Sequence, residues 1–270
     1  MIAKTDQSGL DQLLLNLWND FCHLNPKARK IFELLSKEGE VVQNDHIAFR
    51  TFQHPALGIQ HIAKHFEKYG YKSCGEYFFK EKKLYALHFE HANPAMPKIF
   101  ISELELGKVS PELKSQIESL VATLPKDFSA SEAHFISGRP WTLSHQQYLK
   151  MSAESEYAGW VAAHGFRTNH FTVLTNELKR FKTLASMNEF IASHGYQLNS
   201  AGGIIKGTPA EYLEQSSTMA EKIKVTFSDG EFEIPSCYYE FARRYPLADG
   251  KLYQGFVAQS ADKIFESTNR

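Results

Sequence analysis

Two helix-forming segments open the chain. Across residues 9–24 the apolar side chains recur at the spacing of one helical face. Pro26 then begins a second helix over 26–37, because proline suits the first helical position. We therefore expect residues 1–40 to form a helical hairpin that packs on the rest of the chain. The apolar positions of the first helix are Leu10, Leu13, Leu14, Leu17, Trp18 and Phe21.

A strand, a helix and three further strands follow. Residues 45–52 (DHIAFRTF) alternate in character and are rich in aromatic and branched side chains, which is typical of a strand. Residues 58–69 have the spacing of an amphipathic helix, and Gly70 suits its C-terminal end. Three strand-like runs complete a βαβββ module over 41–106. These runs are 75–80, 84–91 and 98–104.

The same order returns later in the chain. A strand is predicted at 167–174 (RTNHFTVL) and a helix at 181–194. Three more strand-like runs complete a second module over 166–257, and Asp229-Gly230 predicts a tight hairpin between the last two. An insert at 208–221 opens with a helix-start signal. The strand-like runs are 203–206, 222–228 and 231–241.

This internal repeat predicts the fold class. Two copies indicate an α+β protein in which duplicated βαβββ modules form a curved mixed sheet around a cavity, with added helices. Residues 107–165 are expected to be a helical connection, with a helix beginning at Ser110-Pro111 and another over 144–163. Residues 258–270 are predicted as a C-terminal tail, and the whole chain as one compact unit.

Composition narrows the function classes. The chain has 270 residues, 43% hydrophobic and 23% charged, so a sizeable core is expected. The net charge of −1 lacks the basic excess typical of nucleic-acid binders. Three widely spaced cysteines argue against a disulfide framework or a zinc–cysteine site. The polar start Met1–Gly9 does not resemble a signal peptide and no apolar run suits a membrane span, so we expect a cytoplasmic protein.

Histidine and glutamate recur at matching places in the two modules. His46 and His170 lie in the two first strands, and Glu103 and Glu240 lie in the two last strands. These are ligand types for divalent iron, manganese or zinc, and two histidines with one carboxylate leave coordination positions open for substrate. A lone histidine in an apolar strand is usually structural, but two equivalent strands that each carry one favour a metal site.

Further side chains are candidates for the same cavity. Arg50 lies four residues after His46, which puts both on one face of a strand, about 13 Å apart. A guanidinium suits a substrate carboxylate, and a surface ion pair is the alternative. Glu103 is a weaker candidate for a fourth metal ligand. The remaining pocket candidates are Arg139, which can also cap a helix, Gln215 and Ser216, which can also end a helix, and Arg244, which shares the face of Glu240.

Three motifs in order resemble those of a known family. DHIAFRTF, RTNHFTVL and CYYEFARRYP resemble motifs of the 2-oxoadipate dioxygenase/decarboxylase family, a former family of unknown function with a vicinal-oxygen-chelate-like fold. The resemblance implies that His46, His170 and Glu240 hold Fe(II) and that Arg50 binds substrate. It also implies oxidative decarboxylation of 2-oxoadipate to 2-hydroxyglutarate and CO2 with O2, as a step of lysine catabolism.

Alternatives remain open at this point. The same ligands accept Zn, Ni or Mn, and such an ion would drive isomerisation or hydrolysis of a small carboxylate by Lewis-acid action. A non-catalytic protein that binds a small ligand is a third hypothesis. The expected partners are a small 2-oxo dicarboxylic acid and O2, with neither nucleic acid nor membrane. His61 and His65 have helical i, i+4 spacing but lack the H-E-x-x-H motif, so we interpret them as structural.

Overall fold

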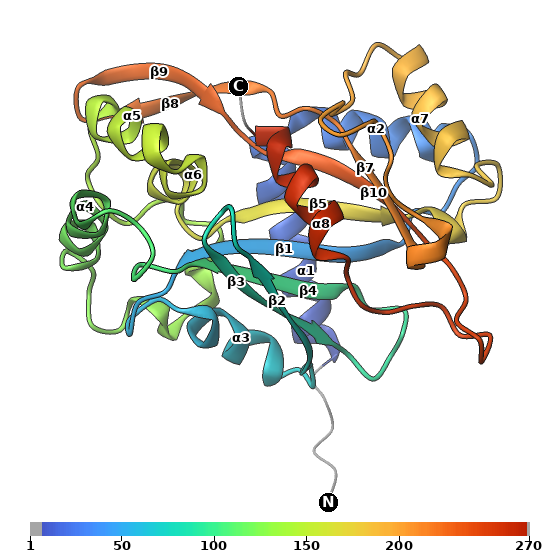
Figure 1. Ribbon diagram of the computed structural model, residues 1–270, viewed down its shortest axis with the longest axis horizontal. Helices are drawn as coiled ribbons and strands as arrows, with labels where there is room; N and C mark the ends of the chain where they lie inside the picture. Colours follow the sequence, from blue (N-terminus) through green and yellow to red (C-terminus); the bar gives the residue numbers. More distant parts are fainter. Residues whose placement is uncertain (1–6, 269–270) are drawn as a thin grey trace, which may run out of the picture.

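Eight strands form one mixed sheet in this computed structural model, which describes residues 7–268. Their order is β2-β3-β4-β1-β5-β10-β7-β6, and the sheet curls around α8 (Ala258–Ile264) in Figure 1. The N-terminal stretch 1–6 and residues 269–270 lie outside the described part. The strands are β1 (Asn44–Phe52), β2 (Lys72–Phe79), β3 (Leu84–Glu90), β4 (Lys98–Leu104), β5 (Thr168–Leu174), β6 (Lys206–Thr208), β7 (Leu213–Ser217) and β10 (Tyr238–Arg244).

The sheet consists of two similar halves. In the first, β1 is followed by α3 (Ile59–Glu67) and pairs in parallel with β4, beyond which β3 and β2 lie. In the second, β5 is followed by α7 (Leu184–Ser193) and pairs in parallel with β10, beyond which β7 and β6 lie. Antiparallel pairing of β1 with β5 joins the halves. The predicted α+β fold of duplicated βαβββ modules is confirmed.

The strand assignments of the second half need correction. The predicted insert 208–221 contains β7, a strand of the main sheet, after the short 3-10 helix Pro209–Glu211. The run 222–228 belongs to β8 (Lys222–Phe227), which pairs only with β9 (Gly230–Pro235) in a separate hairpin. The run 231–241 is therefore two strands, broken after Pro235 before β10 begins. β7 was missed because its polar sequence LEQSS lacks the apolar alternation of a half-buried strand.

Helices cover one face of the sheet and position its strands. α1 (Gln7–Leu24) and α2 (Pro26–Lys37) form the expected N-terminal hairpin. Trp18 and Phe21 of α1 contact the rings of Phe171 and Tyr239, which project from β5 and β10. Because side chains alternate across a strand, this packing turns the neighbouring residues His170 and Glu240 to the other face.

The connection between the modules is helical, as predicted, but has one more break. α4 (Pro111–Val121) begins at Ser110, whose Oγ accepts a hydrogen bond from the backbone N–H of Leu113. The predicted helix over 144–163 is two helices, α5 (His145–Glu154) and α6 (Glu156–His164). Ser155 separates them because its extended backbone ends α5 while its side chain caps α6.

The C-terminal residues are ordered over the open face of the sheet. The predicted tail contains α8 and the 3-10 helix η5 (Phe265–Thr268), and Figure 1 shows α8 in front of the central strands. α8 lies against β2, β6 and β7, so it bridges strands from both halves. The domain boundaries expected from the sequence otherwise stay a prediction.

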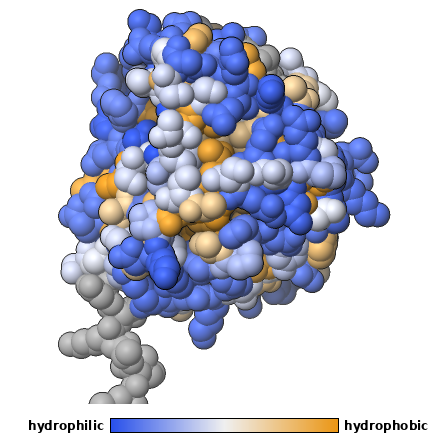
Figure 2. Space-filling model, turned by 90° about the vertical axis from the view of Figure 1, so that its left-hand side faces the viewer, coloured by the Kyte–Doolittle hydropathy of each residue, from blue (hydrophilic) through white to orange (hydrophobic). Residues whose placement is uncertain are grey.

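The exterior is largely polar on the side drawn in Figure 2. Hydrophilic side chains cover most of that face, and hydrophobic ones show in smaller areas near its middle. Among residues 7–268, no helix combines the length and apolar character needed to cross a membrane.

Candidate metal centre

Three buried side chains meet on the face of the sheet that α8 covers. His46 of β1 and His170 of β5 point their Nε2 atoms at each other, 3.3 Å apart. Glu240 of β10 places Oε1 3.7 Å from Nε2 of His46 and Oε2 3.3 Å from Nε2 of His170. Within the described residues, these three form the group of His, Cys, Asp and Glu side chains that could hold a metal ion.

Both histidines are held by the residue that precedes them. Nδ1 of His46 lies 2.8 Å from Oδ2 of Asp45, and Nδ1 of His170 lies 3.1 Å from Oδ1 of Asn169. Each oxygen is an acceptor, so each Nδ1 carries the proton and each Nε2 offers a lone pair to the centre. Such contacts fix the ring orientation and tautomer of metal-binding histidines.

These contacts depend on two β-bulges. Neighbouring residues of a regular strand point to opposite faces and could not make them. Between β1 and β5 the register shifts at Asp45, because Asn44 faces Val173 while His46 faces Thr172. It shifts again at Asn169. Asp45 and Asn169 are thus the extra, unpaired residues, and a bulge re-aims the side chain it carries.

An ion pair and an amide support this arrangement from β10 and β7. Arg244 donates two hydrogen bonds to Asp45, from Nε to Oδ1 at 2.6 Å and from Nη2 to Oδ2 at 2.8 Å. The Arg244 guanidinium also holds the pKa of Asp45 well below its usual range, although burial alone would raise it. Gln215 donates from Nε2 to Oε1 of Glu240 at 2.6 Å, while Oε2 of Glu240 has no hydrogen-bond partner in the described part of the chain.

Burial sets the charge of the three central groups. It raises the pKa of Glu240 to about 8 and lowers the pKa of both His46 and His170. The nearby His46 ring and the Arg50 guanidinium also lower the pKa of His170. At neutral pH without metal, the histidines are therefore neutral ligands and Glu240 is mostly protonated.

The residues fit one divalent ion. Ligand atoms at about 2.1 Å from an ion lie about 3.0 Å apart at right angles and about 3.4 Å apart in a tetrahedron. The observed separations of 3.3, 3.7 and 3.3 Å are close to these values. Oε2 of Glu240 has no hydrogen-bond donor within residues 7–268, so it can accept a metal ion when Glu240 loses its proton. Two histidines with one carboxylate suit Fe(II), and also Zn, Ni or Mn.

The cavity beside the centre is small and mostly apolar. Its volume is about 20 Å³, which has room for about one water molecule. The C-terminal segment closes it with Ala261, Ile264 and Phe265. Phe256 closes another side and meets the ring of His46 edge-on at 4.9 Å between centroids. Phe100, Gln215 and the three central residues complete the lining.

Arg50 shares the face of His46, and two of its five N–H donors already contact the protein. Its Nη1 lies 3.2 Å from Oε1 of Glu156, and its Nη2 donates to Oγ1 of Thr268 at 3.2 Å. The guanidinium also lies 5.7 Å from the ring centroid of Phe265, a wall of the cavity. Its Nε is buried and has no hydrogen-bond partner among residues 7–268. A substrate-binding role for Arg50 stays a prediction.

Glu103 lies on the wrong face for the centre. The register pairs His46 with Lys98 and His170 with Tyr238, so the position equivalent to Glu240 is Phe100. The expected match of Glu103 with Glu240 is thus wrong by three residues, an odd number that reverses the side. Glu103 instead accepts a hydrogen bond from the backbone N–H of Ile59 at the start of α3.

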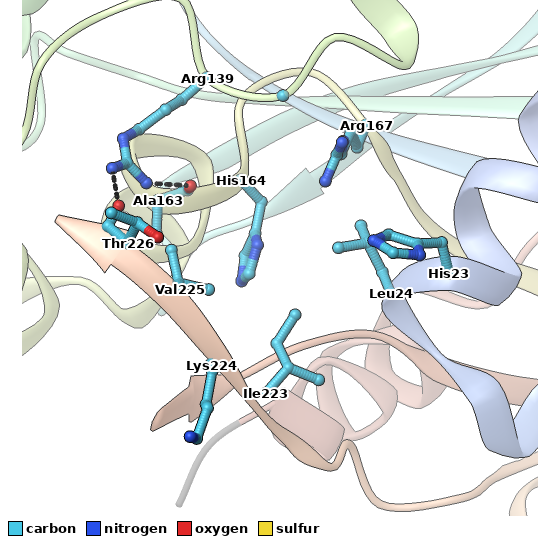
Figure 3. Close-up of a pocket in the computed structure, with 11 residues that line it drawn as sticks. His23, Leu24, Arg139, Ala163, His164, Arg167, Ile223, Lys224, Val225 and Thr226 are labelled. Atoms are coloured by element: carbon cyan, nitrogen blue, oxygen red, sulfur yellow. Dashed lines mark hydrogen bonds between the residues drawn. The ribbon is translucent and has the colours of Figure 1, made fainter. Parts of the chain in front are cut away.

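Of the other four pocket candidates, two lie beside the metal centre and two do not. Gln215 and Arg244 belong to the centre, as described above. Ser216 points to the opposite face and donates to Oδ1 of Asn188 in α7. Arg139 lies elsewhere and donates to the backbone oxygens of Ala163, in the last turn of α6, and Thr226 (Figure 3), which is the helix-capping alternative.

Sequence reasoning missed several residues of the centre. Asp45 and Asn169 carry a local signal, since each histidine is preceded by a short side chain with an acceptor oxygen (DH and NH). The cavity walls Phe256, Ile264 and Phe265 carry no such signal, because they lie at or beyond the end of the second module and reach the site only when the C-terminal residues fold back over the sheet.

Comparisons with known proteins agree on one family. Its sequence model, described as 2-oxoadipate dioxygenase/decarboxylase, matches residues 14–251. The chloroplastic/amyloplastic 2-oxoadipate dioxygenase/decarboxylase of Oryza sativa subsp. japonica is 35% identical over 99% of this chain and 81% of its own length. The Arabidopsis thaliana enzyme of the same name is 33% identical over 92% of this chain and 74% of its own length.

Solved structures share the fold. Hydroxyglutarate synthase from Oryza sativa in complex with 2-oxoadipate has a TM-score of 0.91 and 34% identity, covering 97% of this chain and 92% of that one. A protein from Shewanella frigidimarina NCIMB 400 that carries the provisional name of a hydrolase has a TM-score of 0.89 and 47% identity, covering 94% and 99%. A glyoxalase-superfamily structure from Ralstonia eutropha JMP134, at 18% identity and TM-score 0.69 over 90% and 84%, shares the fold.

Proposed function

Since this chain belongs to the 2-oxoadipate dioxygenase/decarboxylase family, we propose that it converts 2-oxoadipate and O2 to 2-hydroxyglutarate and CO2 with Fe(II) as cofactor. The observation that carries the proposal is the buried His46–His170–Glu240 cluster, whose Nε2 and carboxylate atoms converge on one point. The reaction balances, because one oxygen atom enters the new carboxylate and the other becomes the hydroxyl.

His46, His170 and Glu240 would hold the ion. Bound Fe(II) would supply Lewis-acid and one-electron chemistry toward the 2-oxo acid and O2. Asp45 and Asn169 keep the two imidazoles in the tautomer that presents Nε2. Glu240 must give up its proton when the ion binds, while Gln215 keeps the carboxylate oriented through Oε1.

Arg50 would bind the far carboxylate of the diacid. It lies on the face of His46, about 13 Å along the strand, a span that the acid and the arginine side chain cover together. Its orphaned Nε and its contact with Thr268 leave donors for an incoming carboxylate. The rings of Phe100, Phe256 and Phe265 would exclude water around the chain of the substrate.

The choice of metal and of substrate rests on the relatives. Fe(II) is chosen over Zn, Ni or Mn because the family name is that of a dioxygenase, and the rice relative whose structure contains 2-oxoadipate supports the substrate class. A cytoplasmic location and a role in lysine catabolism stay predictions, and the plant relatives are named as plastid proteins.

Oxygen consumption tests the proposal. The metal-free protein is reloaded anaerobically with Fe(II), given 2-oxoadipate in air, and its products are identified by mass. We expect one O2 consumed per 2-hydroxyglutarate formed, with loss of both in His170→Ala. His61→Ala is the matched control, because His61 lies on α3 and bonds Ser129 and Pro55 away from the centre. Full Fe(II) loading without O2 consumption would overturn the oxidative reaction and favour a non-oxidative metal enzyme.

A further inference from the structure

A second cavity lies apart from the candidate metal centre. Its volume is about 340 Å³, and it shares no lining residue with the cavity beside the centre. It forms where the end of α1, the end of α6 and the strand β8 meet (Figure 3). The lining residues are His23, Leu24, Gly138, Arg139, Ala163, His164, Arg167, Ile223, Lys224, Val225 and Thr226.

The lining is positively charged. Arg139, Arg167 and Lys224 contribute cations, and no aspartate or glutamate is among the described lining residues. Lys224 is exposed, lies 3.4 Å from Glu231 and turns away from the middle of the pocket in Figure 3. The charge that the pocket can offer a ligand therefore comes chiefly from the two arginines.

Both arginines keep donors free for a ligand. Each guanidinium has five N–H donors. Arg139 uses two on the carbonyls of Ala163 and Thr226 and has no carboxylate partner within residues 7–268. Arg167 donates from Nη2 to the carbonyl of Ile136, and its Nε lies 3.3 Å from Oδ2 of Asp20. The remaining donors suit an oxyanion.

His164 adds an acceptor between these donors. Its Nε2 lies 2.9 Å from the carbonyl oxygen of Pro235, which can only accept, so Nε2 carries the proton. Burial, together with the charges of Arg167 and Arg139, lowers the pKa of His164 to about 4, so the ring is neutral at pH 7. Nδ1 is then a bare acceptor with no partner in the described part of the chain, and it suits a hydroxyl donor.

The pocket also lies where two important strands begin. Arg167 directly precedes β5, which carries His170. Pro235 ends β9, and two residues separate it from β10, which carries Glu240. β5 and β10 are parallel, so they start at the same edge of the sheet. A ligand in the pocket would touch Arg167, which precedes β5, and His164, which bonds Pro235 ahead of β10.

We propose that this pocket binds a small oxyanion that also bears a hydroxyl group, with its charged oxygens on Arg139 and Arg167 and its hydroxyl donating to Nδ1 of His164. Hydrogen phosphate and 2-hydroxycarboxylates share this chemistry. The inference is independent of the proposed reaction, because it uses none of the residues of the metal centre.

Titration calorimetry of the full-length, metal-free protein at pH 7 tests the inference. The probes are inorganic phosphate, 2-hydroxyglutarate and glutarate, which lacks the hydroxyl. We expect saturable binding that weakens about 10-fold or more in Arg139→Gln and in Arg167→Gln, as for lost charge-assisted hydrogen bonds. Arg167→Gln is a second test should Arg139→Gln misfold, because Arg167 bonds Ile136 and Asp20 rather than the two carbonyls held by Arg139. Lys224→Gln, at the rim, should change the affinity less than about twofold.

The three probes distinguish the ligand class. Tighter binding of 2-hydroxyglutarate than of glutarate, by about fivefold for one hydrogen bond, supports a hydroxycarboxylate. Binding of phosphate alone supports hydrogen phosphate. No saturable binding of any probe, or binding that folded Arg139→Gln and Arg167→Gln both retain, would overturn the site. Equal affinities for 2-hydroxyglutarate and glutarate would overturn the role of His164.

Discussion

Asn169 shows how a single side chain can control a ligand without touching the ion. Its Oδ1 is the acceptor that holds Nδ1 of His170. Asn169→Ala should therefore weaken metal binding about 10- to 100-fold, the usual effect of losing such a partner. Anaerobic titration with Fe(II) or Co(II) measures it.

The control for Asn169→Ala is Asn188→Ala. That change also removes a buried amide contact, to Oγ of Ser216, but on the helix-covered face. It should lower stability and leave metal affinity unchanged. Equal metal affinity in both variants would contradict an orienting role for Asn169.

Glu240 makes metal binding depend on pH. Burial raises its pKa to about 8 in the metal-free protein, so at pH 7 binding must displace a proton. The lowered pKa values of His46 and His170 leave both neutral above pH 6.5, so they add no proton. Metal affinity should rise about 10-fold per pH unit from 6.5 to 8 and then level off.

Calorimetry in buffers of different ionisation enthalpy counts the protons. Close to one should be released per ion at pH 7. Glu240→Gln, which cannot titrate, should bind more weakly and release none. Release of no proton by the unmodified protein would contradict a protonated Glu240.

At the scale of elements, the C-terminal segment, which consists of α8 and η5, controls access of substrate to the metal centre. A cavity of about 20 Å³ cannot hold a six-carbon diacid, and α8 and η5 supply much of its wall. We therefore expect substrate to displace this segment. Lys82, in the turn between β2 and β3, holds Glu266 of η5 at 2.5 Å, and Thr268 bonds Arg50.

Locking the segment should stop turnover. Lys82→Cys and Glu266→Cys, in a Cys74→Ser background because Cys74 is an exposed thiol, allow a cleavable bis-thiol reagent to link η5 to the sheet. Turnover of 2-oxoadipate should fall at least 10-fold on linking and return on reduction. Each single-cysteine variant, treated identically, is the control. Full turnover in the linked protein would show that substrate enters without movement of η5.

The strands β1 and β5 could be predicted from the sequence, but their bulges could not. The alternating sequences DHIAFRTF and RTNHFTVL predict both strands. The same alternation places Asp45 and Asn169 on the faces opposite their histidines, which is wrong for both. A bulge depends on the pairing of two distant segments, so neither sequence alone indicates it.

For the whole molecule, the Asp45–Arg244 pair ties the two modules together. It joins β1 to β10, and Arg244 also donates to the carbonyl oxygens of Tyr253 and Gly255, which lead to α8. Breaking a buried pair leaves an unpaired charge, so Arg244→Met should lower the free energy of unfolding by about 3–5 kcal/mol. Urea unfolding measures it.

The same unfolding experiment tests the expected compact unit. Because β1 and β5 pair within one sheet, circular dichroism and tryptophan fluorescence should follow a single transition. Lys224→Gln, which breaks an exposed pair with Glu231, should change stability by less than about 1 kcal/mol. Two separate transitions would show that the modules fold independently.

The sequence alone predicted the repeated βαβββ order, though not the correct strands of its second copy, and the two histidines with Glu240 as metal ligands, because hydrophobic periodicity and residue chemistry are local properties. The tertiary structure decided which residues support them. The register put Phe100 in the place expected for Glu103, and β7 supplied Gln215 from a run without strand character. Arg244 and the C-terminal segment reached the site through folding of the whole chain. Such long-range pairings depend on how the whole chain buries its apolar surface, and a local sequence pattern does not specify that.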